Sequence, residues 1–127
     1  MAINPYAAPQ AEVRDIAAAQ EYQQVQLWSP RGRVGRLRYL AWVFGFQFLV
    51  GVPAGILAAI VPDLAGILVV ALYLVAFVFS TLMAIKRSHD MDWSGWSVLL
   101  TLIPLVALIW VFKAGTEGPN RFGNPPP

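Results

Sequence analysis

The chain is organised around Lys86-Arg87-Ser88-His89-Asp90-Met91-Asp92-Trp93-Ser94-Gly95-Trp96, a short polar island between two long apolar runs. The island contains two adjacent cations, two carboxylates, two tryptophans and the only histidine of the protein. Because the apolar runs on both sides are expected to enter a membrane, the island is predicted to lie at one bilayer surface.

The composition is that of a small membrane protein. Of the 127 residues, 57% are hydrophobic and 13% are charged, whereas about 25% of residues are charged in ordinary soluble proteins. The apolar residues occur in blocks and not with a helical or strand period. A formal net charge of +2 is too small to favour a nucleic-acid partner, and the absence of cysteine excludes disulfides and thiolate metal sites. The first residues lack a basic region followed by an apolar core, so no cleavable signal peptide is expected.

Two long runs without charge predict a transmembrane hairpin. Residues 39–61 and 64–85 number 23 and 22, which as helices span about 34 and 33 Å. That length crosses a hydrocarbon core of roughly 30 Å. Only Pro62-Asp63 connects the two runs, so the helices are expected to be antiparallel neighbours joined by a tight turn.

A third, shorter apolar run follows the island. Residues 96–112 number 17, which as a helix reach about 26 Å, near the lower limit for a span. Trp93 and Trp96 are expected at the inner interface and Trp110 at the outer one. The predicted fold is therefore an all-α membrane protein with three transmembrane helices. A re-entrant segment that turns at Pro104 is the alternative.

The predicted organisation comprises one membrane domain between two tails. Residues 1–27, rich in Ala, Gln and Pro, are expected to be a disordered cytoplasmic tail, with a tyrosine-containing docking peptide as the alternative. Residues 28–113 form the membrane domain, and residues 114–127 form a Gly/Pro-rich tail that is either a turn-rich cap or free. Four arginines precede the first run and two cations occupy the island. This bias places the N-terminus in the cytoplasm and, after three spans, the C-terminus outside.

Small residues in the first two runs predict close helix packing. Gly51 and Gly55 are four residues apart, as are Ala76 and Ser80. Small faces let helices approach closely in lipid, so Gly55→Leu is expected to disrupt packing or oligomerisation. Gln47, the strongly polar side chain of the first run, is expected to face another helix.

Charged residues near the inner surface suggest one interfacial cluster, made up of Arg33, Arg36, Arg87, His89 and Asp90. The hairpin returns the island to the depth of the first arginines, so Asp90 is expected to pair with an arginine. Asp92 has no assigned partner. Arg33 and Arg36 are one helical turn apart. In the functional interpretation they form a fork that binds a phosphate or carboxylate. In the simpler interpretation they contact anionic lipid.

Catalytic and metal sites are not predicted. His89 beside Asp90 is not by itself a catalytic pair, because the carboxylate must orient the imidazole toward a substrate proton. Ser88 and Ser94 lack a supporting nucleophile motif, and a single histidine with two aspartates is an incomplete ligand set. We therefore expect no catalytic residue, no metal and no cofactor.

Three motifs together make the chain resemble the bacterial membrane family known as domain of unknown function 805. They are Gly32-Arg33-Val34-Gly35-Arg36-Leu37-Arg38-Tyr39-Leu40, then Lys86-Arg87-Ser88-His89-Asp90 with Ser94-Gly95-Trp96-Ser97, and Gly115-Thr116-Glu117-Gly118-Pro119-Asn120-Arg121-Phe122-Gly123. The resemblance covers about residues 28–126. Leu40 and Ser97 stand where the family usually has tryptophan, Lys86 where it has arginine, and Ser88 where it has leucine. The tail motif adds Asn120 and Arg121 to the candidate residues. The resemblance implies a multi-pass inner-membrane protein whose activity is not established.

The small helix faces favour a non-enzymatic protein that acts by oligomerisation or as a partner of a membrane complex. One alternative is a transport or channel subunit, although no ionisable side chain lies inside a predicted span. The other alternative is a binder of anionic lipid headgroups at the cytoplasmic surface. The predicted partners are therefore the lipid bilayer, anionic phospholipid, and a second copy or another membrane protein.

Overall fold

The computed structural model describes residues 26–127, so the tail predicted for residues 1–27 lies almost entirely outside the described residues. The elements are α2 (Arg36–Ile60), α3 (Pro62–Asp90), the 3₁₀ helix η1 (Gly95–Leu102) and α4 (Pro104–Phe112). No strand occurs in residues 26–127 beyond an isolated bridge between Asn120 and Gly123. The prediction of an all-α fold is confirmed for this part of the chain.

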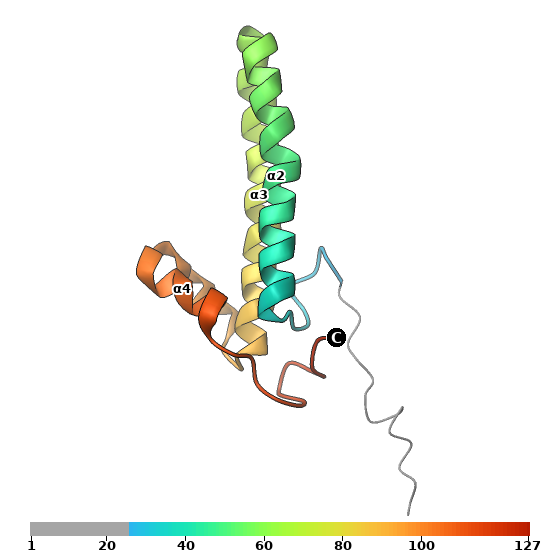
Figure 1. Ribbon diagram of the computed structural model, residues 1–127, viewed down its shortest axis with the longest axis vertical. Helices are drawn as coiled ribbons and strands as arrows, with labels where there is room; N and C mark the ends of the chain where they lie inside the picture. The colour runs from blue at the N-terminus through green and yellow to red at the C-terminus, as the bar shows by residue number, and fades with distance from the viewer. Residues whose placement is uncertain (1–25) are drawn as a thin grey trace, which may run out of the picture.

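Helices α2 and α3 form a long antiparallel hairpin (Figure 1). Val61 alone separates them, with φ −133° and ψ 68°, and Pro62 begins α3. The fixed φ of proline suits the first helical position, where its missing N–H is not needed. The turn is therefore even shorter than the predicted Pro62-Asp63 connection.

Both helices extend beyond the predicted spans at the same end of the hairpin. Helix α2 begins at Arg36, three residues before the predicted start at Tyr39. Helix α3 continues through Lys86 to Asp90 and includes the first half of the polar island. The first five of the eleven island residues are therefore the end of a helix and not a loop. Backbone N–H groups of Met91 and Asp92 bond to the last carbonyls of α3, and Asp92 adopts φ 59°.

Alanines and one aromatic stack make the hairpin contact. Ala54, Ala65 and Ala76 are buried, and the rings of Phe46 and Phe79 stack with centroids 4.1 Å apart. Small side chains at these positions allow the two backbones to approach closely. The prediction of a packing face is confirmed for Ala76.

The predicted glycine contact within the hairpin is wrong for Gly55, whereas Gly51 lies near α3. A Cβ on Gly55 would meet nothing within 4 Å, and one on Gly51 would only touch the Tyr73 hydroxyl at 4.0 Å. Ala54, one residue away from Gly55 and on a different side of α2, makes the contact instead. Ser80 is partly buried beside the contact, and its Oγ has no hydrogen-bond partner among the described residues.

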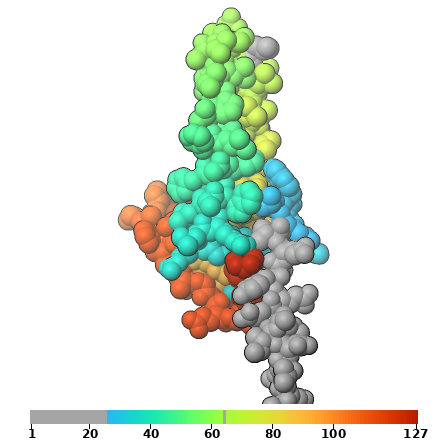
Figure 2. Space-filling view, turned by 45° about the vertical axis from the view of Figure 1, so that its right-hand side comes forward, coloured from blue at the N-terminus to red at the C-terminus, as the bar shows by residue number. Residues whose placement is uncertain are grey.

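The outer surface of the hairpin is apolar along its length. Helix α2 and residues 65–90 of α3 are long and apolar enough to cross a membrane, yet only 11% and 22% of their most apolar windows are buried. Core helices of soluble proteins are mostly buried, so these proportions fit helices that face lipid. Figure 2 shows the hairpin as a narrow stalk that rises from a wider base.

Residues 95–112 do not form the single continuous helix that the sequence predicted for the third segment. They form η1, an extended residue Ile103 with φ −93° and ψ 111°, and then α4. Pro104 disfavours helical backbone at the residue before it, so the run breaks in its middle. The nine residues of α4 reach only about 14 Å. Both pieces lie beside the lower part of α3 and turn back there (Figure 1).

The fold-back also changes the positions of Trp110 and the C-terminal tail. Trp110 is fully buried against α3 and is not at an outer interface. Residues 113–127 return to the end of the hairpin that holds the start of α2, where Pro126 Cγ lies 3.7 Å from the Cβ position of Gly35. The expectation that the tail lies at the opposite end from the arginines therefore does not hold. Of the two predicted forms of the tail, the structure shows the cap.

Candidate functional site

Asp90 lies at the centre of a buried ionic cluster at the base of the hairpin. Its Oδ1 accepts hydrogen bonds from Arg33 Nε at 3.2 Å and Arg33 Nη2 at 3.0 Å, and its Oδ2 accepts one from Arg87 Nη1. The two arginine side chains are 0% exposed and that of Asp90 is 5% exposed. The prediction that Asp90 pairs with an arginine is confirmed, and it pairs with two.

Arg33 connects this carboxylate to the C-terminal tail. Its Nη1 donates to the carbonyls of Gly118 at 2.7 Å and Gly123 at 3.2 Å, and its Nη2 donates to the carbonyl of Thr116 at 2.7 Å. The Thr116 hydroxyl accepts a further bond at 3.1 Å. All three guanidinium nitrogens are therefore engaged by protein groups. A planar fork of donors suits such a set of acceptors better than an ammonium would.

Arg87 connects the same carboxylate to the end of α4. Its Nε donates to the carbonyl of Trp110 at 2.9 Å, and its Nη2 donates to the carbonyl of Lys113. The last carbonyls of a helix have no partner within the helix, and a cation there is also favoured by the helix dipole. The Trp110 indole donates to Ser88 Oγ at 2.9 Å and so joins α4 to α3 a second time.

The tail in turn caps the end of α3. Thr116 donates its backbone N–H to the carbonyl of Asp90 at 2.7 Å and its hydroxyl to the same oxygen at 3.0 Å. Asn120 Nδ2 donates to the carbonyl of His89 at 2.8 Å. We call Arg33, Arg87, Asp90, Thr116 and Asn120 the clasp, because they join four separate segments: the loop before α2, α3, α4 and the tail.

His89 lies beside the clasp, as predicted. Its ring stacks on Phe122 with centroids 4.0 Å apart and planes 8° apart. Its Nδ1 lies 3.2 Å from the carbonyl of Gly32, and because a carbonyl only accepts, Nδ1 is the protonated nitrogen. The imidazole therefore contacts both the loop before α2, through Gly32, and the tail, through Phe122.

The structure separates Arg36 from the other predicted cluster residues. Arg36 is the first residue of α2 and is exposed, whereas Arg33 is buried. The predicted phosphate fork of Arg33 and Arg36 is therefore not formed. Because the donor nitrogens of Arg33 and Arg87 are all engaged by protein groups, the clasp is suited to holding segments together and not to holding an anion.

Asp92 and Arg121 form a separate pair, which supplies the partner that the sequence analysis did not assign to Asp92. Arg121 Nε donates to Asp92 Oδ1 at 3.1 Å, and the two side chains are 60% and 46% exposed. Exposed pairs contribute about 1 kcal/mol at most. Arg121, named from the tail motif, is therefore outside the clasp, whereas Asn120 is part of it.

Sequence reasoning missed Thr116, Gly115 and Lys86 as structural residues. Thr116 makes several hydrogen bonds of the clasp. Its place in the tail motif, which begins Gly115-Thr116, could have identified it from the sequence. Lys86 is buried, and its Nζ donates to the carbonyl of Gln26. No group of three or more His, Cys, Asp or Glu that would suit a metal ion occurs within the described part of the chain.

Comparison with known proteins agrees with a membrane location. The family model "Protein of unknown function (DUF805)" matches residues 27–124, a range that contains the whole clasp. Inner membrane protein YhaH of Escherichia coli strain K12 is 34% identical over 105 residues, which cover 76% of this chain and 85% of YhaH. Inner membrane protein YhaI of the same strain is 45% identical over 60 residues, which cover 43% of this chain and 51% of YhaI.

No solved structure matches the chain. The similarity to YhaH and YhaI supports an inner-membrane location. The family match covers most of the chain and includes the loop before α2, both long helices, the fold-back and most of the tail. The chain therefore belongs to the DUF805 family of proteins of unknown function.

Proposed function

We propose that this chain is a non-enzymatic membrane protein that acts by associating within the bilayer, first of all with a second copy of itself. The observation that carries the proposal is a mostly apolar groove halfway along the hairpin that contains two polar side chains unpaired among the described residues, Gln47 and Ser80. The groove has a volume of about 430 Å³ and is lined by Gln47, Val70, Tyr73, Leu74, Phe77 and Ser80. Gln47 lies 11 residues after the start of α2 and Ser80 lies 10 residues before the end of α3.

The polar groups of this groove lack partners. Gln47 is exposed and makes no hydrogen bond to the described residues, and Ser80 Oγ is buried without a partner among them. The bilayer core offers no water to such groups, so they are best satisfied by another helix. A glutamine amide both donates and accepts, and therefore pairs with the same residue of a second copy across a twofold axis.

The charge distribution supports an orientation with both tails in the cytoplasm. All eight lysines and arginines of residues 26–127 lie in or beside the base of the hairpin. Asp63 is the charged residue at the opposite turn. Cations flanking spans are retained on the cytoplasmic side, so the base, which holds the tail through the clasp, is proposed to face the cytoplasm.

This orientation predicts the outcome of a reporter experiment. A reporter active only outside the cytoplasm is expected to be inactive after Pro127 and active when inserted after Asp63. A reporter active only in the cytoplasm is expected to show the opposite pattern. Extracytoplasmic activity after Pro127 would instead mean that residues 95–112 cross the bilayer.

Association predicts weaker dimerisation for substitutions along the face of α2 that carries Gln47 and Gly55. Gln47→Leu removes the interhelical hydrogen bonds, which are worth about 1 kcal/mol in lipid, so dimerisation is expected to weaken roughly fivefold. Gly55→Leu is expected to weaken association too, and it leaves the hairpin intact because the added side chain meets open space. Energy transfer between labelled chains in lipid vesicles, measured against chain density, gives the dissociation constant.

Two matched controls separate association from folding. Phe48→Leu changes an exposed side chain next to Gln47 that does not line the groove. Gly66→Leu adds the same side chain as Gly55→Leu at an equally open position, but on α3 and away from Gly51 and Gly55. Both controls are expected to associate like the wild type. Energy transfer at the level of unrelated chains in the wild type itself would reject a second copy and leave a different membrane protein as the partner.

A further inference from the structure

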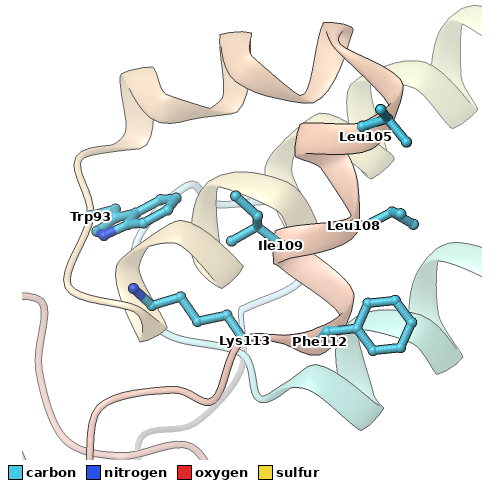
Figure 3. A pocket seen from close by; sticks show the side chains of 6 residues that line it. All are labelled: Trp93, Leu105, Leu108, Ile109, Phe112 and Lys113. Carbon is cyan, nitrogen blue, oxygen red and sulfur yellow. The ribbon is translucent and has the colours of Figure 1, made fainter.

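A second groove lies at the base of the molecule, between the residues before η1 and the outer face of α4. It has a volume of about 570 Å³ and is lined by Trp93, Leu105, Leu108, Ile109, Phe112 and Lys113. Figure 3 shows Trp93 and Lys113 together at one side of the groove, with Leu105 and Leu108 on the other. Its size is in the range of ligand sites, which commonly hold about 300–1,000 Å³.

Lys113 is the one charged residue of this groove. Its Nζ lies 4.5 Å from the centroid of the Trp93 ring, and no carboxylate within the described residues forms an ion pair with it. The Lys113 carbonyl accepts a hydrogen bond from Arg87. The clasp therefore fixes the backbone position of this cation, while its ammonium group stays available.

The lining of the groove changes from charged to apolar along α4, from Lys113 at the base toward Leu105. Lys113 follows the end of α4 at the base, and Leu105 lies eight residues earlier in the chain, about 12 Å along the helix. The fold-back places that earlier end farther up the hairpin (Figure 1). In a bilayer crossed by the hairpin, the ammonium is therefore nearest the headgroups and the leucines are nearest the acyl chains.

We propose that this groove binds one anionic phospholipid, with an acyl chain along Leu105, Leu108 and Ile109 and the phosphate at Lys113. The charge of the groove matches an anionic headgroup, and its apolar length matches a hydrocarbon chain. In a bilayer the acyl chain is already out of water, so the selectivity of the groove for one lipid comes from the cation.

The site differs from the headgroup site expected from the sequence. Arg33 and Arg87 are buried and their donors are all engaged, so neither is available to a lipid phosphate. Their contribution is indirect, because Arg87 holds the backbone of Lys113 in place. The proposal does not depend on association between chains. It requires only that the hairpin crosses the membrane.

Native mass spectrometry of the full chain in detergent tests this proposal, with palmitoyl-oleoyl phosphatidylglycerol and the matching phosphatidylcholine as probes. The wild type is expected to retain one phosphatidylglycerol in preference to phosphatidylcholine. Lys113→Gln is expected to weaken phosphatidylglycerol binding about fivefold, the effect of one cation near an anionic surface, and to remove the preference. Lys113→Arg keeps the charge and is expected to keep the preference.

Further variants separate the groove from general surface charge. Arg38→Gln removes an exposed cation at the same end that does not line the groove, and it is expected to bind like the wild type. Leu108→Trp fills the groove and is expected to weaken the binding of both lipids. Lys113→Gln changes one exposed side chain and carries the test alone if Leu108→Trp does not fold.

Four outcomes would overturn the proposal. The first is an unchanged preference for phosphatidylglycerol in Lys113→Gln. The second is a loss of phosphatidylglycerol binding in Arg38→Gln that equals the loss in Lys113→Gln, which would indicate that the general surface charge binds the lipid. The third is displacement of the lipid by soluble glycerol phosphate, which would indicate a headgroup site without a chain. The fourth is a wild-type dimer lost in Leu108→Trp, which would indicate that a second copy occupies the groove.

Discussion

Asp90→Asn is expected to lower the stability and the folded yield of the protein strongly. The substitution keeps the shape of the side chain but removes the negative charge between two fully buried guanidinium groups. Removing one partner of a buried ion pair costs about 3–5 kcal/mol, because the remaining charge is left uncompensated. Many domains are stable by only about 5–15 kcal/mol, so the loss is a large fraction of the total.

The yield of monodisperse protein after detergent extraction and its thermal midpoint measure this effect. Asp92→Asn is the matched control, since it makes the same chemical change two residues away in an exposed pair with Arg121. Such pairs contribute about 1 kcal/mol or less, so the control is expected to resemble the wild type. Equal thermal midpoints for Asp90→Asn and the wild type would show that the clasp is not what holds the base together.

Gly115→Ala is expected to open the clasp from the side of the tail. An added Cβ would lie 2.6 Å from Asp90 Cγ and 2.9 Å from Asp90 Oδ1. Asp90 cannot turn away, because Arg33 and Arg87 hold both of its oxygens. The tail must therefore move, and it loses the adjacent Thr116 bonds when it does. Overpacking alone commonly costs about 1–3 kcal/mol.

Limited trypsin digestion is a direct measure of this opening. Cleavage after Arg121 is expected to be faster in Gly115→Ala than in the wild type, and the thermal midpoint is expected to fall. Gly45→Ala is the control, because a Cβ there meets nothing within 4 Å and alanine favours helix. If the tail of Gly115→Ala resists trypsin as well as the wild type does, the tail is not held by this contact.

The two effects are connected because the clasp is a single network. Asp90 contacts the loop before α2 through Arg33, and its carbonyl binds the tail through Thr116. Arg87 extends the network to α4. A defect at Asp90 or Gly115 is therefore expected to loosen the fold-back and the Lys113 groove together. The hairpin contact at Ala54 and Ala76 is higher up and is expected to remain.

The sequence by itself determined the hairpin and the position of its charged end. Residues 39–61 and 64–85 are uncharged and long enough to span a bilayer, and a connection of one or two residues permits only an antiparallel arrangement. The pairing of Asp90 with Arg87 was also predictable, because residues three apart lie on the same face of a helix. These features depend on the length of the apolar runs, on the positions of the charges and on the spacing of nearby residues, all of which can be read directly from the sequence.

The tertiary structure decided between the two forms that the sequence allowed for residues 96–112, and it alone decided the composition of the clasp. Hydrophobicity does not distinguish a short span over residues 96–112 from two short helices, and the break at Ile103 follows from where Pro104 falls. Burial of Arg33 and exposure of Arg36 depend on the partner groups that the tail brings to Arg33 from 83 or more positions away. A buried cation is stable only where distant segments supply its acceptors, and periodicity along the chain carries no information about those segments.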